Sequence, residues 1–80
     1  MTLDTLKVGE SAVVTKINNV DTERRRLFDL GILPGTRIEN VMQSPLGDPV
    51  AYRVRNSTVA LRRVQAQLIE IQEVIKAQEN

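Results

Sequence analysis

The side chains that this chain lacks limit the chemistry it can carry out. Its 80 residues include no cysteine and no histidine, which excludes disulfides, thiol nucleophiles, imidazole acid–base catalysis and the usual zinc ligands. The serines Ser11, Ser44 and Ser57 therefore have no histidine to activate them. Carboxylates are spread singly, and the glycines match no phosphate-binding spacing. We expect no catalytic residue, no cofactor and no metal centre, and leave open only a weak contact of oxygen ligands with Mg²⁺ or Ca²⁺.

Arginine is the most abundant ionisable residue of the chain, with eight arginines against three lysines. One basic run consists of Arg24, Arg25 and Arg26, and a second group comprises Arg53, Arg55, Arg62 and Arg63. Either group could be a solvated face whose aliphatic stems cover apolar surface. Either could also form ion pairs with an acidic partner, a role that favours arginine.

Binding of RNA or of a ribosomal surface is the alternative role for these arginines. The net charge of only +1 argues against a dedicated electrostatic nucleic-acid binder. Single-strand binders also interleave stacking aromatic rings with basic residues. Here Phe28 and Tyr52 are the only rings, and Tyr52 is expected to point inward. We therefore favour protein docking and expect no nucleic-acid partner.

The length and composition predict one small folded domain. The chain has a mass of 9.0 kDa and is 41% hydrophobic, which is too apolar for intrinsic disorder. No stretch approaches the roughly 18 apolar residues of a membrane span, and the N-terminus does not read as a signal peptide. We expect a cytoplasmic domain over residues 1–74 and a polar tail over 75–80. Such a domain reaches a membrane only through a partner.

Short strands separated by turn residues predict a mainly β fold. We expect strands over 10–17, with a bulge near Thr15, and over 36–43 and 50–55. A fourth strand should contain Val59 and Leu61, and the last should contain Ile69 and Ile71, after a single helical turn over 63–66. Five short strands with one short helix after the first indicate a small closed SH3-like barrel, because closure removes exposed strand edges.

The inserted helix follows the first strand and has clear end signals. Asp21 is expected to be its N-cap, and Gly31 should end it in a left-handed conformation. Leu27 and Leu30 share a face, with Phe28 beside them. A helix this short buries only one stripe, so one apolar residue should stay at the surface, and we expect it to be Leu27. An apolar residue rimmed by arginines is a reasonable interaction site.

The turns are expected to be structural. Pro34 and Gly35 fit the two central positions of a type II turn. The segment 44–47 fits a type I turn, and Pro49 must begin a strand or lie at an edge. Asn56 is expected to supply the positive φ of a two-residue hairpin connection, Asn56-Ser57. The structural turn residues are thus Gly31, Pro34, Gly35, Gly47, Pro49 and Asn56.

Three segments of the chain resemble the FeoA family, the small ferrous iron transport protein A. They are RLFDLGILPGT over 26–36, PLGDP over 45–49 and VALRR over 59–63, and the similarity runs from about residue 3 to residue 74. The resemblance implies an SH3-like barrel without enzymatic activity. It also implies a cytosolic accessory of bacterial ferrous iron uptake that contacts the G-protein part of the membrane transporter FeoB.

Together, the residues and the resemblance predict a docking protein. Self-association, oligomeric state, any contact with iron, and whether the protein acts on assembly, GTP hydrolysis or gating stay open. Asp48 could contact a partner, although an aspartate before a proline in a turn more often has a structural role. The residues that we expect at the partner contact are Arg24, Arg25, Arg26, Leu27, Phe28 and Leu30, with Pro45, Leu46 and Asp48 as a second candidate.

Overall fold

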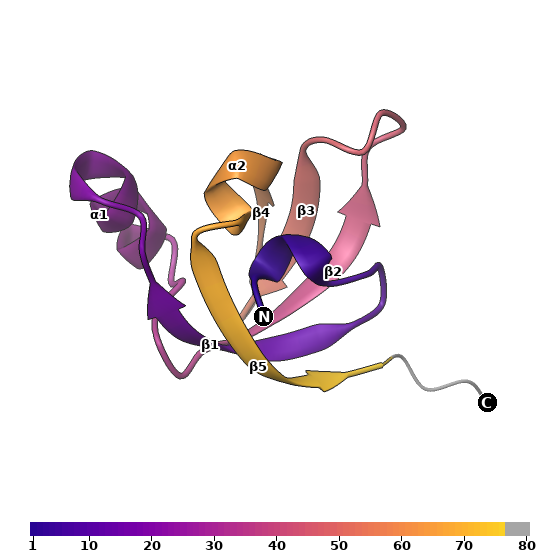
Figure 1. The fold of residues 1–80 in the computed structure, drawn as a ribbon. Helices are drawn as coiled ribbons and strands as arrows, with labels where there is room; N and C mark the ends of the chain where they lie inside the picture. The colour runs from indigo at the N-terminus through magenta and orange to yellow at the C-terminus, as the bar shows by residue number, and fades with distance from the viewer. Residues whose placement is uncertain (77–80) are drawn as a thin grey trace.

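A computed structural model describes residues 1–76 of the chain. The predicted tail over 75–80 lies largely outside this range, and its first residue, Ile75, ends the last strand. In chain order the elements are η1 (Leu3–Thr5), β1 (Ser11–Ile17), α1 (Asp21–Asp29), β2 (Arg37–Gln43), β3 (Val50–Val54), β4 (Ser57–Leu61), α2 (Arg63–Ala66) and β5 (Ile69–Ile75) (Figure 1).

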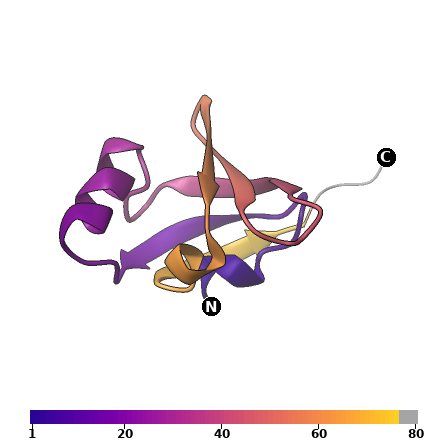
Figure 2. The same cartoon turned by 90° about the horizontal axis from the view of Figure 1, so that it is seen from above.

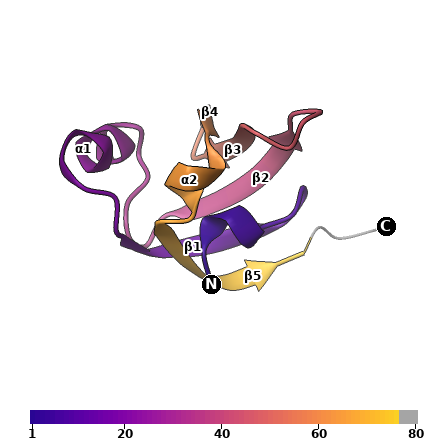
Figure 3. The same cartoon turned by 45° about the horizontal axis from the view of Figure 1, so that its top comes forward.

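The five strands form one antiparallel sheet in the order β4-β3-β2-β1-β5. This confirms the mainly β architecture and the helix inserted after the first strand. The expectation of a closed barrel is wrong, because β4 and β5 end the strand order and do not pair within residues 1–76. The short helix α2 connects β4 to β5 and contacts η1. Together, α2 and η1 lie where β4 and β5 would pair in a closed barrel (Figure 3).

The core lies on the inner face of the curved sheet. Strand β3 alternates as expected, with Val50, Tyr52 and Val54 buried and Arg53 exposed. Apolar side chains of the other elements complete the core: Leu3, Leu6, Ala12, Val14, Ile17, Leu27, Ile32, Ile38, Val59, Leu61, Ala66, Ile69 and Ile71. Seen from above, the β3–β4 hairpin projects from the body of the sheet (Figure 2).

Strand β1 is irregular, as predicted. Its register against β5 shifts between Val14 and Lys16, which confirms the expected bulge. A second shift, between Ser11 and Val13, was not predicted. The burial of Asn40 of β2 was likewise not predicted. Its Nδ2 donates to the backbone oxygen of Leu6 at 2.9 Å, so it anchors the segment before β1.

Helix α1 has the predicted end but not the predicted cap. Gly31 has a φ of +91°, which confirms the left-handed termination. The helix begins at Asp21, and no side chain caps it from the preceding position, so the N-cap assignment is wrong. Instead, Nδ2 of Asn19 donates to Oε1 of Glu23 at 2.6 Å and to the backbone oxygen of Gln65 at 3.2 Å. The segment before α1 is thereby tied both to the helix and to α2.

Two of the three predicted turns form as expected. Thr36 N–H donates to the oxygen of Leu33 at 3.0 Å, with Gly35 at a φ of +93°, which fits the type II turn. The N–H of Gly47 donates to Ser44 at 2.8 Å and closes the turn over 44–47.

The hairpin turn between β3 and β4 is displaced by one residue from its predicted position. Val54 pairs with Ser57, so the connection is Arg55-Asn56 rather than Asn56-Ser57. The residue with positive φ there is Arg55, at +57°. The prediction for Asn56 is therefore wrong, because strand pairing, not local preference, sets the position of the turn.

Candidate functional site

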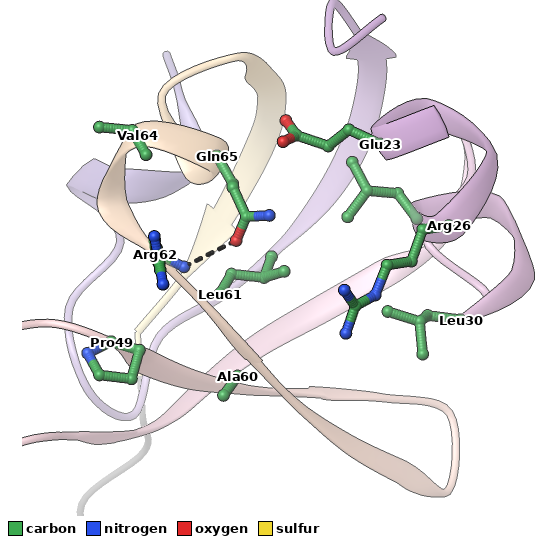
Figure 4. Close-up of a pocket in the computed structure, with 10 residues that line it drawn as sticks. Glu23, Arg26, Leu30, Pro49, Ala60, Leu61, Arg62, Val64 and Gln65 are labelled. Carbon is green, nitrogen blue, oxygen red and sulfur yellow. Dashed lines mark hydrogen bonds between the residues drawn. The ribbon is translucent and has the colours of Figure 1, made fainter. Parts of the chain in front are cut away.

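A groove of about 380 Å³ lies between α1 and the end of β4. The first wall is formed by one stripe of α1, since Glu23, Arg26 and Leu27 recur at helical spacing, together with Leu30 just after the helix. The opposite wall comes from β4, the start of α2 and the residue before β3 (Figure 4). The residues that line the groove are Glu23, Arg26, Leu27, Leu30, Pro49, Ala60, Leu61, Arg62, Val64 and Gln65.

On the helix wall, the residue that reaches the surface is not the predicted one. Leu27 is only 1% exposed and belongs to the core, so the expectation of a partly exposed Leu27 is wrong. Leu30 is 37% exposed and takes that role. The difference arises because Leu27 lies within the last turn, facing the sheet, whereas Leu30 follows the last helical residue. Leu27 thus underlies the groove, and Leu30 offers apolar surface to a ligand.

The opposite wall contains hydrogen bonds at the start of α2. The backbone N–H of Arg62 donates to Oε1 of Gln65 at 2.9 Å, which is the dashed line in Figure 4. Val64 projects from this helical turn and is 64% exposed. The groove therefore has an exposed apolar side chain on each wall, Leu30 on one and Val64 on the other.

The charge of the groove is predominantly positive. Arg26 and Arg62 line opposite walls, with Glu23 as the acidic lining residue. Oε1 of Glu23 already accepts a hydrogen bond from Asn19. Within residues 1–76, the ion pair present joins Arg53 and Glu39 at 3.7 Å. Both groove arginines are therefore available to carboxylates of a ligand.

The structure separates the predicted helix contact into two faces. Arg26, Leu27 and Leu30 line the groove, whereas Arg24, Arg25 and Phe28 do not. The guanidinium of Arg24 lies 5.2 Å from the centre of the Phe28 ring, a cation–π arrangement. Phe28 is half-buried against the core, so its main contact is internal.

The second candidate contact, the loop between β2 and β3, lies outside the groove except for its last residue. Leu46 at the loop tip is 95% exposed, and Pro49 at the base lines the groove. Oδ1 of Asp48 accepts a hydrogen bond of 3.1 Å from the backbone N–H of Arg63. Nε of Arg63 donates to the oxygen of Gly47, also at 3.1 Å. Asp48 thus has a structural contact within the protein.

Most of the second wall was not predicted from the sequence. Of the arginine group predicted from the sequence, Arg53, Arg55, Arg62 and Arg63, only Arg62 reaches this groove. Arg53 and Arg55 instead line a shallower hollow with Arg37, and Arg63 bonds to the β2–β3 loop. An apolar residue on a single helical turn, Val64, was the signal that could have indicated a surface contact.

Residues 1–76 contain neither a cluster of metal-ligating side chains nor a helix that could span a membrane. No group of three or more carboxylates gathers there as a metal site would require. No helix there is long and apolar enough to cross a membrane.

Comparison with known proteins relates this fold to solved structures. FeoA of Chlorobium tepidum, solved by NMR, is 35% identical with a TM-score of 0.85, over 89% of this chain and 68% of that chain. FeoA of Stenotrophomonas maltophilia, solved in complex with zinc and described as a prokaryotic SH3 domain protein, is 28% identical with a TM-score of 0.87. That match covers 98% of this chain and 99% of the other, and it confirms the SH3-like fold.

A curated relative and a family model identify the chain. The relative is an Fe(2+) transport protein A/Fe(2+) transporter FeoB fusion protein of Porphyromonas gingivalis, 36% identical over 72 residues. The match covers 90% of this chain, which spans only 8% of the length of that relative. The model of the FeoA domain matches residues 1–73. The chain therefore belongs to the FeoA domain family.

Proposed function

We propose that this protein is a non-catalytic, cytoplasmic accessory of bacterial ferrous iron uptake that docks on the cytosolic G-protein part of a FeoB-like membrane transporter. The groove between α1 and β4 supplies the contact, with Leu30, Val64, Arg26 and Arg62 at its surface. The observation that carries this proposal is a groove with apolar and cationic walls in a chain of the FeoA domain family.

The relatives support the choice of partner. The Porphyromonas gingivalis protein joins an Fe(2+) transport protein A and an Fe(2+) transporter FeoB in one fusion protein. Fusion holds two modules at a high effective concentration, which suits modules that interact. The Stenotrophomonas maltophilia structure is described in connection with activation of bacterial ferrous iron transport. Both observations favour a transporter partner for this chain.

The composition of the groove favours docking over catalysis. Its walls offer two exposed apolar side chains and two arginines, and arginine is enriched at protein interfaces. The groove lining contains no serine, lysine, cysteine or histidine, and its carboxylate, Glu23, already accepts a hydrogen bond from Asn19. The groove is suited to hold a segment of another protein.

Calorimetric titration into the FeoB-like transporter of the same genome tests the proposal. The titration uses the whole transporter in detergent and, separately, its cytosolic domain, each with GDP and with a non-hydrolysable GTP analogue. A salt concentration of about 150 mM screens weak surface attraction. We expect saturable binding to both preparations. A nucleotide-dependent affinity would indicate regulation of the GTPase, and equal affinity would indicate an assembly role.

Two matched leucine variants locate the contact. Leu30→Gln replaces an apolar side chain of the groove by a polar one. Leu46→Gln makes the same replacement at the more exposed loop tip, outside the groove. We expect Leu30→Gln to weaken binding at least about tenfold, a cost of roughly 1.4 kcal/mol, and Leu46→Gln to leave it unchanged. The reverse pattern would move the contact to the loop, the second candidate.

The titration also tests the alternative role in nucleic-acid binding. Absence of binding to either transporter preparation would overturn the proposal. Steeply salt-dependent binding to RNA would then favour that alternative, because phosphate contacts release counterions.

A further inference from the structure

We propose, on the basis of the function proposed above, that the partner segment binds as an extended strand along the free edge of β4 and becomes a sixth strand of the sheet. This mode of recognition combines main-chain hydrogen bonds, which supply affinity, with side-chain pockets, which supply specificity. Three features of the structure carry the inference: the free edge, the course of the groove and its charge.

The pairing of β4 shows which of its backbone groups are free. Val54 and Ser57 flank a two-residue connection, so they form a hydrogen-bonded pair. Because bonded and non-bonded pairs alternate along an antiparallel ladder, Val59 and Leu61 also bond to β3. The N–H and C=O groups of Thr58 and Ala60 therefore point away from the sheet.

The opposite edge of the sheet is partly covered, which distinguishes it from β4. Thr2 forms a bridge with Glu70 on the outer side of β5. The N–H of Ile71 donates to the oxygen of Met1 at 2.9 Å. Within residues 1–76, no backbone hydrogen bond of this kind engages the outward N–H and C=O groups of Thr58 or Ala60. Their side chains are small and exposed, so β4 presents an open edge, which natural sheets usually block.

The groove runs along this edge rather than over one face of the sheet. Ala60, Leu61 and Arg62 are consecutive and all line it. Ala60 and Leu61 are the last two residues of β4, and side chains of successive strand residues point to opposite faces, so one ligand site meets both only at the strand edge. Arg26 of α1 and Leu30, just after the end of α1, face this edge (Figure 4). A strand placed beside β4 would thus lie between β4 and α1.

The charge and the apolar surface of the groove indicate which side chains the bound partner segment should carry. Arg26 and Arg62 carry no internal ion pair in the described chain, so they favour a carboxylate on the ligand. Leu30 and Val64 favour an apolar residue. We therefore infer an extended acidic segment of the transporter's cytosolic part, with an apolar side chain next to a glutamate or aspartate.

Amide hydrogen exchange of the ¹⁵N-labelled protein, free and saturated with the transporter's cytosolic domain, tests strand addition without any mutation. In the free protein the amides of Thr58 and Ala60 should exchange rapidly, because they lack acceptors. In the complex we expect at least one of them to slow by tenfold or more. The amide of Val59, already bonded to β3, serves as the internal reference. Unchanged exchange of both Thr58 and Ala60 in the saturated complex would overturn the inference.

A backbone variant gives a second test. Ala60→Pro removes the outward N–H, and proline is tolerated in edge strands where this group faces solvent. Ala60→Val keeps the N–H and is the matched control. We expect Ala60→Pro to weaken binding of the transporter domain at least tenfold and Ala60→Val to weaken it less than threefold. A thermal melt of each variant establishes that it is folded.

The outcomes separate this inference from the function on which it rests. If Leu30→Gln weakens binding but Ala60→Pro does not and the amides stay unprotected, the groove docks the transporter by side chains alone and strand addition is wrong. If the unmodified protein fails to bind either transporter preparation, the proposed function is wrong and the inference fails with it.

Discussion

Asp48 and Arg63 are joined across 15 positions of the chain by a hydrogen bond of 3.1 Å from the backbone N–H of Arg63 to Oδ1 of Asp48. The side chain of Arg63 returns to the same loop, donating from Nε to the oxygen of Gly47 at 3.1 Å. Its Nη1 also lies 3.5 Å from the oxygen of Asp4. The two residues thereby connect the β2–β3 loop, the start of α2 and the N-terminal segment, and they hold the second wall of the groove in place.

Asp48→Ala should lower the free energy of unfolding by about 1 kcal/mol, because the side chain satisfies an N–H in the first turn of α2 as a capping residue does. Asp48→Asn keeps an oxygen acceptor and should cost less than half as much. Urea denaturation of the three proteins measures the difference. Equal stability of Asp48→Ala and the unmodified protein would show that the hydrogen bond contributes nothing.

Leu27→Ala and Leu30→Ala should separate stability from binding. Leu27 is buried in the core, so its truncation should cost about 2–4 kcal/mol of unfolding free energy. Leu30 is partly exposed, and the same change there should cost less than about 1 kcal/mol. Transporter binding should fall for Leu30→Ala at a temperature where the protein stays folded. A larger stability loss at position 30 than at 27 would contradict the assigned burial.

Gly31→Val should destabilise the fold through backbone strain rather than through a clash. Its φ of +91° is a conformation that β-branched residues avoid, whereas a Cβ there would meet Val54 Cγ1 at an ordinary 3.6 Å. We expect a loss of at least about 1–2 kcal/mol and a lower melting temperature. Gly35→Ala is the comparison for backbone strain without any contact, because Gly35 has a similar φ and a Cβ added there would have no atom within 4 Å. A melt of Gly31→Val that does not shift would refute the strain argument.

Features set by local chemistry could be predicted from the sequence. The left-handed Gly31, the turn at Pro34-Gly35 and the alternation of β3 depend on neighbouring residues alone. The helical turn Arg63–Ala66 was also predicted with its observed bounds. In each case a short segment carries its own conformational preference, which the rest of the chain does not override.

Features set by contacts between distant segments could not be predicted. The burial of Leu27, in place of Leu30, depends on how α1 lies against the sheet, and this orientation is not encoded in the helix itself. The hairpin position follows from pairing Val54 with Ser57. The groove is lined by residues from 23–30 and from 60–65. Its second wall could therefore be predicted only if the position of the β3–β4 hairpin beside α1 were known.

Tyr52 should make stability fall at alkaline pH. Its side chain is only 1% exposed, and burial raises the pKa of the phenol from 10.0 to about 12. Between these values the unfolded chain releases the proton while the folded protein retains it, so the free energy of unfolding decreases as pH rises. Two pKa units correspond to roughly 2–3 kcal/mol, fully present below about pH 10 and lost as the pH approaches 12. Urea denaturation at about pH 9 and pH 11.5 measures this loss, and Tyr52→Phe, which removes only the titrating hydroxyl, should show a smaller one. An equal decline in both proteins would assign the alkaline loss to other groups.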